Sequence, residues 1–286
     1  MNEPVSHKEF ESIYRQATDE VLNYWTEAMQ REIASHNRGW APEDYNFKVY
    51  LEASLVRFYC AYLAMASGSS TKTVCDVGGF WGVFPVTLRA LGFDVTMTES
   101  LQYYSGSFNR LFDHIRAKGV TIEDYDPFQA GASLSRKFDF VTVMAVLEHY
   151  PHSLHDFMTN AKSLLNSKGR LYLEVPNIAF WPKRMGLLLG NSPLTPFGNI
   201  YRSKVPFIGH HHEFTVSELG ELARLSGLEI LSTRAYNYSP NTGFYWKTVI
   251  RHPIQTLAFC LLKDSRECLA VLCTSKDGNH GSQTTF

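Results

Sequence analysis

The sequence predicts an α/β fold in which a mostly parallel, seven-stranded sheet is covered by helices on both faces. Two observations predict it. From residue 73 onward, short apolar runs alternate with longer segments of helical periodicity, which is typical of doubly wound sheets. Before that point, apolar residues recur at spacings of three and four, as in amphipathic helices. We therefore expect a helical N-terminal cap over residues 1–70 and one sheet domain over residues 71–286.

Seven segments are expected to form the strands because apolar and β-branched residues are concentrated in them: 73–77, 93–98, 120–125, 138–145, 170–176, 227–238 and 267–276. Helices are expected in two pieces within 6–66, and then over 82–91, 104–118, 153–166 and 215–227. Thr215 or Ser217 can cap the last of these helices, and Gly227 can end it.

The charge, the cysteines and the apolar stretches of the sequence disfavour several classes of protein. The net charge is −1, so the chain lacks the basic surplus typical of proteins that bind nucleic acid. The five cysteines form no CxxC pair, which disfavours a disulfide framework or zinc site and favours a reducing compartment. The polar N-terminus does not resemble a signal peptide, and no apolar stretch reaches the roughly 20 residues that span a bilayer. We expect a cytoplasmic protein, and its oligomeric state is not indicated.

One connection, residues 178–209, is unusually long and rich in proline, glycine and aromatic residues. Long connections in compact domains are commonly lids or binding loops, although this one could instead only cover the edge of the sheet. Its first part, residues 178–190, mixes basic and apolar side chains. It is therefore also expected to be able to contact a membrane surface peripherally.

A glycine-rich turn follows the first strand, with Asp76 before it and Gly78, Gly79 and Gly82 within it. Glycine lets the backbone approach a ligand closely, and a helix start attracts a carboxylate or phosphate. The dinucleotide fingerprint and the phosphate-binding P-loop both fail at this turn. An acid at position 76 would also repel a pyrophosphate.

S-adenosylmethionine suits this turn better, because its sulfonium and ammonium groups favour an acid and its carboxylate suits the helix start. Glu99 ends the second predicted strand, about twenty residues further on, where an acid can accept the ribose hydroxyls. Taken alone, Glu99 could equally be a solvated residue at a strand end.

Several motifs together resemble class I, Rossmann-like, S-adenosylmethionine-dependent methyltransferases over residues 72–235. DVGGFWG resembles the first motif of that superfamily, with Phe80 at the middle glycine position and Gly79 shifted by one. VTIEDYDPF and FDFVTVMAVLEHY resemble the ends of its third and fourth strands. HHHEFTVSELGELARLSGLEI resembles a segment of bacterial small-molecule and glycan methyltransferases.

The resemblance implies that S-adenosyl-L-methionine is the cofactor and S-adenosyl-L-homocysteine the product. It also implies that Asp126 meets the adenine, with Asp124 as the alternative. The residues expected to bind the cofactor are Asp76, Gly78, Gly79, Gly82, Glu99, Asp126, Phe128 and Val146.

Methyl transfer to a hydroxyl needs a base, and histidine is suited to this role. His149, and His211 within the triplet 210–212, are the candidate catalytic residues; structural roles are the alternatives. No metal is expected, because consecutive histidines point in different directions. Basic and aromatic residues of the 178–209 insert suit a small molecule or glycan with an anionic group and a flat or sugar-like body. The insert resembles those of bacterial glycan and lipid-linked sugar methyltransferases, and this resemblance implies O-methylation of a sugar or related polar metabolite. The alternatives are N- or C-methylation of a quinone or small amine, or a binding module without activity.

Overall fold

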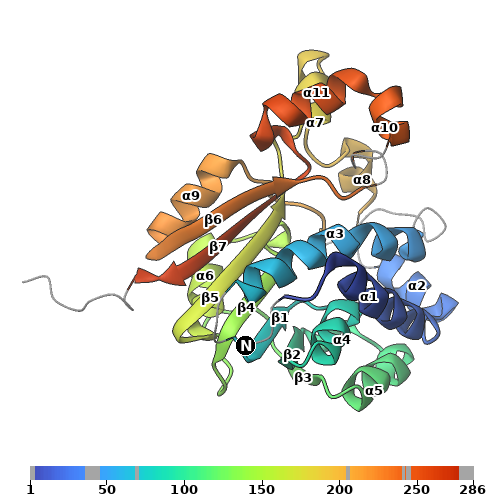
Figure 1. Ribbon diagram of the computed structural model, residues 1–286, viewed down its shortest axis with the longest axis vertical. Helices are drawn as coiled ribbons and strands as arrows, with labels where there is room; N and C mark the ends of the chain where they lie inside the picture. The colour runs from blue at the N-terminus through green and yellow to red at the C-terminus, as the bar shows by residue number, and fades with distance from the viewer. Residues whose placement is uncertain are drawn as a thin grey trace, which may run out of the picture.

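The computed structural model describes residues 4–35, 46–67, 71–203, 207–239, 242 and 246–276. In this part of the chain seven strands form one sheet of order β3-β2-β1-β4-β5-β7-β6 (Figure 1). The strands are β1 (Thr73–Val77), β2 (Asp94–Glu99), β3 (Thr121–Asp124), β4 (Phe138–Met144), β5 (Leu165–Pro176), β6 (Leu228–Tyr236) and β7 (Cys268–Ser275). Only β7 runs antiparallel to its neighbours β5 and β6. The predicted fold and all seven predicted strands are confirmed.

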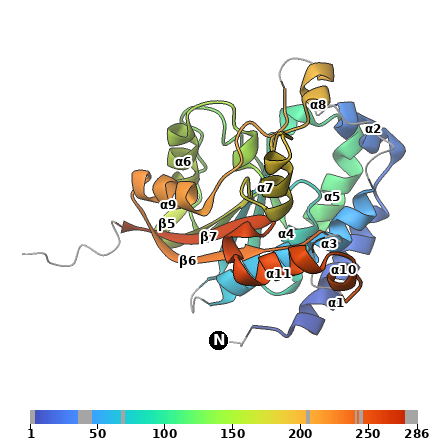
Figure 2. The same ribbon diagram turned by 90° about the horizontal axis from the view of Figure 1, so that it is seen from above.

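Helices cover both faces of the sheet, as Figures 1 and 2 show. The bounds are α1 (His7–Leu22), α2 (Glu27–Ser35), α3 (Phe47–Ala66), α4 (Val83–Ala90), α5 (Asn109–Ala117), α6 (Leu154–Ser163) and α9 (Val216–Leu225). Buried residues of α1, α3, α4 and α5 share one apolar core with the sheet, and those of α6 and α9 share the core on the opposite face. The sheet is therefore buried between two layers, as its nearly continuous apolar strands require.

Helix starts follow local hydrogen-bonding rules. The Asn46 side chain accepts the Val49 N–H at 3.1 Å and begins α3. At α9, the Thr215 hydroxyl accepts the Glu218 N–H while the Glu218 carboxylate accepts the Thr215 N–H. This reciprocal capping box confirms Thr215 as the predicted cap. Gly227 follows the helix with φ of 67°, a left-handed conformation that glycine adopts without steric cost.

A buried ion pair joins the N-terminal helices to the sheet. Arg57 of α3 donates from Nε and Nη2 to the two carboxylate oxygens of Glu174 of β5, at 2.9 and 2.8 Å. Both side chains are almost completely buried. The Tyr236 hydroxyl also donates to Glu174, at 2.5 Å, and Arg57 donates to the Tyr50 hydroxyl at 2.7 Å. The described residues of the N-terminal cap thus share a core with the sheet, and the domain boundary near residue 70 stays a prediction.

Four further helices stand beyond the carboxyl ends of the parallel strands. The insert 178–209 contains α7 (Trp181–Leu188) and α8 (Phe197–Arg202), and the β6–β7 connection contains α10 (Trp246–Arg251) and α11 (Pro253–Leu261). The sequence pattern does not predict the last pair. The Phe180 and Phe259 rings stack at 5.9 Å between their centroids, which joins the start of α7 to α11. In the described residues no helix is long and apolar enough to cross a membrane.

Candidate active site

The glycine turn connects β1 to α4, and its three glycine positions are packed too tightly to accept a side chain. Gly78 and Gly82 have φ of 70° and 71°. A Cβ atom on Gly78 would lie 2.8 Å from Cγ2 of Val146, and one on Gly79 would lie 2.5 Å from Cγ of Met97. Such contacts are closer than real carbon atoms tolerate. The sequence-predicted residues Gly78, Gly79, Gly82 and Val146 are therefore brought together at one turn.

Two residues other than glycine have a left-handed backbone at this site, and one of them, Phe80, occupies the middle glycine position of the motif. Phe80 has φ of 42°, a left-handed value that costs energy for a residue with a side chain. In the chain segment after β4, Ala145 is also left-handed, with φ of 56°. This bend directs the chain from β4 into the short 3₁₀ turn Leu147–His149.

Replacing Gly82 with alanine is expected to destabilise the fold by more than the same change at Gly92. Both glycines are left-handed, with φ of 71° and 94°, so both variants lose about 1–2 kcal/mol through backbone strain. Only at Gly82 would the new Cβ atom also lie 2.4 Å from Cδ1 of the buried Ile115, whereas nothing lies within 4 Å at Gly92. Urea unfolding of the two variants measures the difference, and equal losses would contradict the close packing described for this turn.

Asp76 lies at the end of β1 and is buried. Its Oδ1 atom accepts the Thr142 hydroxyl of β4 at 2.5 Å. Burial raises the pKa of Asp76 to about 7, and repulsion from Glu99 adds to this, while the bond from Thr142 opposes it. A Cβ atom on Gly79 would lie 3.0 Å from Oδ2 of Asp76, and the N–H of the next residue, Phe80, donates to Glu99, so the two predicted cofactor-binding acids both lie against this turn. A cation placed between them would offset the cost of ionising Asp76.

Glu99 is buried at the end of β2, and its two carboxylate oxygens accept hydrogen bonds from within the chain. The Phe80 N–H donates to Oε1, and the Tyr104 hydroxyl donates to Oε2 at 2.8 Å. Sequence reasoning misses Tyr104, because neither its position nor its residue type distinguishes it in the sequence. A ribose that binds Glu99 must therefore replace Phe80 or Tyr104, or share the carboxylate with them.

The loop after β3 contains the two acids considered for adenine. The Asp126 carboxylate accepts the Phe128 N–H at 2.9 Å, so these two predicted residues form one local turn. The Phe128 ring packs against Tyr150, with centroids 5.0 Å apart. The exposed Asp124 accepts the Leu101 N–H at 3.0 Å. Neither bond decides which acid meets adenine, so that choice stays a prediction.

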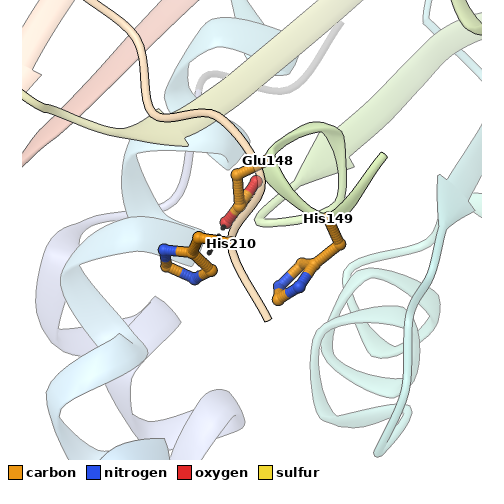
Figure 3. Close-up of side chains that lie close together, drawn as sticks. All are labelled: Glu148, His149 and His210. Atoms are coloured by element: carbon orange, nitrogen blue, oxygen red, sulfur yellow. Dashed lines mark ion pairs between the residues drawn. The ribbon is translucent and has the colours of Figure 1, made fainter. Parts of the chain in front are cut away.

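The side chains of Glu148 and His149, in the turn after β4, lie close to the side chain of His210 from the 207–214 segment (Figure 3). The His149 and His210 rings lie 4.9 Å apart, and Nε2 of His210 lies 4.0 Å from Oε1 of the buried Glu148. Oε2 of Glu148 has no hydrogen-bond partner among the described residues. Burial raises the pKa of Glu148 to about 7, and attraction to His210 only partly opposes the increase.

Hydrogen bonds fix the tautomers of both imidazoles. Nδ1 of His149 lies 2.8 Å from the Ile208 carbonyl oxygen, which can only accept, so Nδ1 carries the proton. Nδ1 of His210 lies 2.9 Å from the Glu213 carboxylate and donates to it in the same way. In the neutral form of each ring Nε2 is then the basic nitrogen.

Glu213 is held as an anion beside His210. Burial disfavours its charge, but hydrogen bonds from His210 and from Lys183 of α7 outweigh that effect and lower the pKa of Glu213. The pair therefore has the carboxylate–imidazole arrangement that orients a catalytic base. Through Lys183, the first helix of the insert is joined to this pair.

The His211 side chain does not point toward Glu148 and His149, as would be expected of a catalytic base. Its side chain is exposed, and its Nε2 atom lies 2.9 Å from the Phe207 carbonyl oxygen. Its backbone N–H donates to the Glu148 carbonyl at 2.7 Å, which fixes the 207–214 segment against the turn after β4. The structure thus brings His210 rather than His211 to His149, and a catalytic role for His211 stays a prediction.

A metal ion is a further possibility at the same place. One potential ligand atom from each of Glu148, His149 and His210 lies within 4.8 Å of the others. Carboxylate and imidazole ligands suit several divalent cations. That this site holds no metal therefore stays a prediction from the sequence.

Comparisons with known proteins identify the family of this chain. A family model described as a methyltransferase domain matches residues 50–233. The ubiquinone biosynthesis O-methyltransferase of Actinobacillus pleuropneumoniae serotype 7 (strain AP76) is 28% identical over 188 residues, covering 63% of this chain and 76% of the relative.

Among solved structures, the CcbJ methyltransferase from Streptomyces caelestis has a TM-score of 0.50 and 14% identity, covering 76% of this chain and 88% of its own. The N-methyltransferase NodS from Bradyrhizobium japonicum WM9, in complex with S-adenosyl-L-homocysteine, has a TM-score of 0.49 and 14% identity. It covers 87% of this chain and 97% of its own.

The family match and the fold identify a class I methyltransferase. The chain belongs to the methyltransferase-domain family, and it is an enzyme whose cofactor is S-adenosylmethionine. The residues present fit that cofactor, because two buried acids flank a turn whose glycine positions cannot accommodate a side chain. That Asp76 and Glu99 accept from its ammonium and ribose hydroxyl groups, and that the start of α4 binds its carboxylate, stay predictions.

Proposed function

We propose that this methyltransferase methylates a hydroxyl oxygen of a small polar acceptor, a sugar or a related metabolite. The single observation that carries the proposal is the pair of imidazoles, each of which donates its Nδ1 proton to an acceptor, so that Nε2 is the basic nitrogen of the neutral ring. A neutral amine needs no base before it attacks, whereas a hydroxyl must lose its proton. The name of the curated relative, an O-methyltransferase, supports oxygen as the acceptor atom.

Different residues bind the cofactor and remove the proton of the acceptor. Bound S-adenosylmethionine supplies a methyl group on a positively charged sulfur. Asp76 and Glu99 bind and orient the cofactor, and alignment of the two reactants is worth about 7–11 kcal/mol in comparable reactions. Nε2 of His149 or of His210 takes the acceptor proton, and Glu213 stabilises the charge that then forms on His210.

Separate replacement of the histidines tests the proposal. In His149→Gln and His210→Gln, we expect turnover of a hydroxyl acceptor to fall by about 10²–10⁴-fold in at least one variant. The measurement is transfer of a radiolabelled methyl group to a panel of sugars, phenols and amines. Binding of S-adenosylhomocysteine, measured by calorimetry, should stay unchanged, since neither imidazole belongs to the cofactor turn.

The matched control is His211→Gln, which removes an exposed imidazole from the same segment. Loss of turnover in this variant alone would make His211 the base instead. Full activity of both His149→Gln and His210→Gln would remove both as bases. Methylation of amines only would favour the N-methyltransferase alternative.

A further inference from the structure

Exposed apolar side chains are concentrated at one end of the molecule. In the described part of the chain, every large hydrophobic residue that is exposed lies on α7, α8, α10, α11 or the loops next to them, except Val49, Tyr103, Leu225 and Leu231. In Figure 1 all four helices lie at one end of the molecule, beyond the sheet, and Figure 2 shows α7 between α8 on one side and α10 and α11 on the other. We call this group of exposed residues the apolar rim.

Two segments form the apolar rim, the 178–209 insert and the β6–β7 connection. In the insert, the end of α7 and the residue after it contribute Leu187, Leu188 and Leu189, of which the last two are 78% and 80% exposed. Phe197 and Tyr201 of α8 are equally exposed. Soluble chains rarely leave such adjacent leucines in water without a partner for them.

The helix α11 is apolar on both sides. Ala258 and Phe259 are buried, and Phe259 stacks on Phe180. Ile254, Leu257 and Leu261 lie at spacings of three and four and are exposed. A helix that is apolar all round is normally covered on all sides, so the outer side of α11 indicates a binding surface.

The charges of the same segments identify the partner. Residues 178–209 contain no Asp or Glu, although acids slightly outnumber bases in the whole chain, and the β6–β7 connection, residues 237–267, contains only Asp264 and Glu267. The two segments contain eight basic residues: Lys183, Arg184, Arg202, Lys204, Lys247, Arg251, Lys263 and Arg266. Lys183 pairs with Glu213, which lies outside the two segments, and Arg184 pairs with Asp264. The two segments together therefore carry a net positive charge.

A second copy of the chain fits this surface poorly. A twofold interface would place the basic segments against identical basic segments, and like charges repel. A bilayer with anionic headgroups attracts the bases and accepts the leucines at its apolar boundary. Since no described helix is long enough to cross, the contact is interfacial.

We propose that the apolar rim binds the surface of a bilayer that contains anionic phospholipid. The surface is larger than residues 178–190, because the β6–β7 connection contributes α10 and α11 to it. The same helix that exposes Leu187 and Leu188 also provides Lys183, which bonds to Glu213 beside His210. The binding surface and the imidazole pair are therefore linked through α7.

Co-sedimentation of the full chain with vesicles tests the proposal. Vesicles of phosphatidylcholine with about one third phosphatidylglycerol should bind the protein, and high salt or pure phosphatidylcholine should weaken binding. Leu188→Gln and Ile254→Gln should each reduce partitioning by about tenfold. Arg251→Gln should reduce it by about fivefold on the anionic vesicles only.

The matched controls are Leu225→Gln and Arg224→Gln on α9, which are exposed to a similar degree outside the rim and should bind as the unaltered chain does. Thermal unfolding confirms that each variant is folded. Equal binding of rim and control variants would overturn the proposal. So would concentration-dependent dimerisation, in ultracentrifugation, that Leu188→Gln abolishes while vesicles remain unbound, because a second copy would then cover the rim.

Discussion

Replacing Arg57 with methionine is expected to lower the free energy of unfolding by about 3–5 kcal/mol. The change leaves the Glu174 carboxylate buried without its bidentate partner, and the Tyr236 hydroxyl alone does not compensate its charge. Burying an uncompensated charge is among the costliest single changes in a protein. Urea unfolding at pH 7 measures the loss.

The control for Arg57→Met is Arg15→Met in α1. Arg15 pairs with Glu11 at 2.8 Å, but Arg15 is exposed and Glu11 is partly exposed, so removing that pair should cost less than about 1 kcal/mol. If the two variants lose the same stability, the buried pair does not anchor α3 to the sheet. A double change of Arg57 and Glu174 to apolar residues should recover part of the loss, since no lone charge remains.

The second large effect is expected at Asp76. The Asp76→Asn variant should bind S-adenosylhomocysteine at least about tenfold more weakly at pH 8, because it lacks a charged acceptor for the ammonium group.

The free energy of unfolding of Asp76→Asn should also depend less on pH than that of the unaltered chain. The pKa of Asp76 is about 7 in the folded chain against an ordinary 3.8, so the folded chain holds an extra proton between these values. Stability then falls as pH rises through about 7.

Between pH 5 and pH 8 the unaltered chain should therefore lose about 2–3 kcal/mol more than Asp76→Asn. The control is Asp139→Asn. The Asp139 carboxylate accepts the Lys72 and Thr73 N–H groups, both at 2.9 Å, and these bonds outweigh burial and lower its pKa. Asp139 stabilises the fold more as pH rises, which is the opposite sign. Identical pH profiles for the Asp76 variant and the unaltered chain would contradict a buried, protonatable Asp76.

The sheet could be predicted because its strands are buried on both faces and so appear as apolar runs between polar turns. TVCDV at 73–77 and FDFVTVM at 138–144 are such runs, and both are strands. The helix pair α10 and α11 could not be predicted in this way. PIQTLAFCLL is apolar without a polar stripe, and short segments of that kind carry no periodicity that separates helix from strand.

The cofactor turn could be located from glycine spacing and flanking acids, since backbone geometry restricts which residues fit there. The catalytic group could not be resolved to a residue. Residues 207–213 have no regular secondary structure, so the sequence does not determine which histidine of the triplet turns toward Glu148. Tyr104 is close to Glu99 only through the path of the loop after β2, and nothing in the sequence signals that contact.

The reversed direction of β7 has a consequence for how this enzyme can diversify. Because β7 runs opposite to β5 and β6, the last residues of β5 and β6, Pro176 and Tyr236, lie beside the first residue of β7, Cys268. The 178–209 insert and the β6–β7 connection both begin at this end of the sheet and return to it. Either can be lengthened, shortened or exchanged without altering a single strand pairing, so the membrane binding proposed for these segments can evolve separately from the scaffold of the sheet.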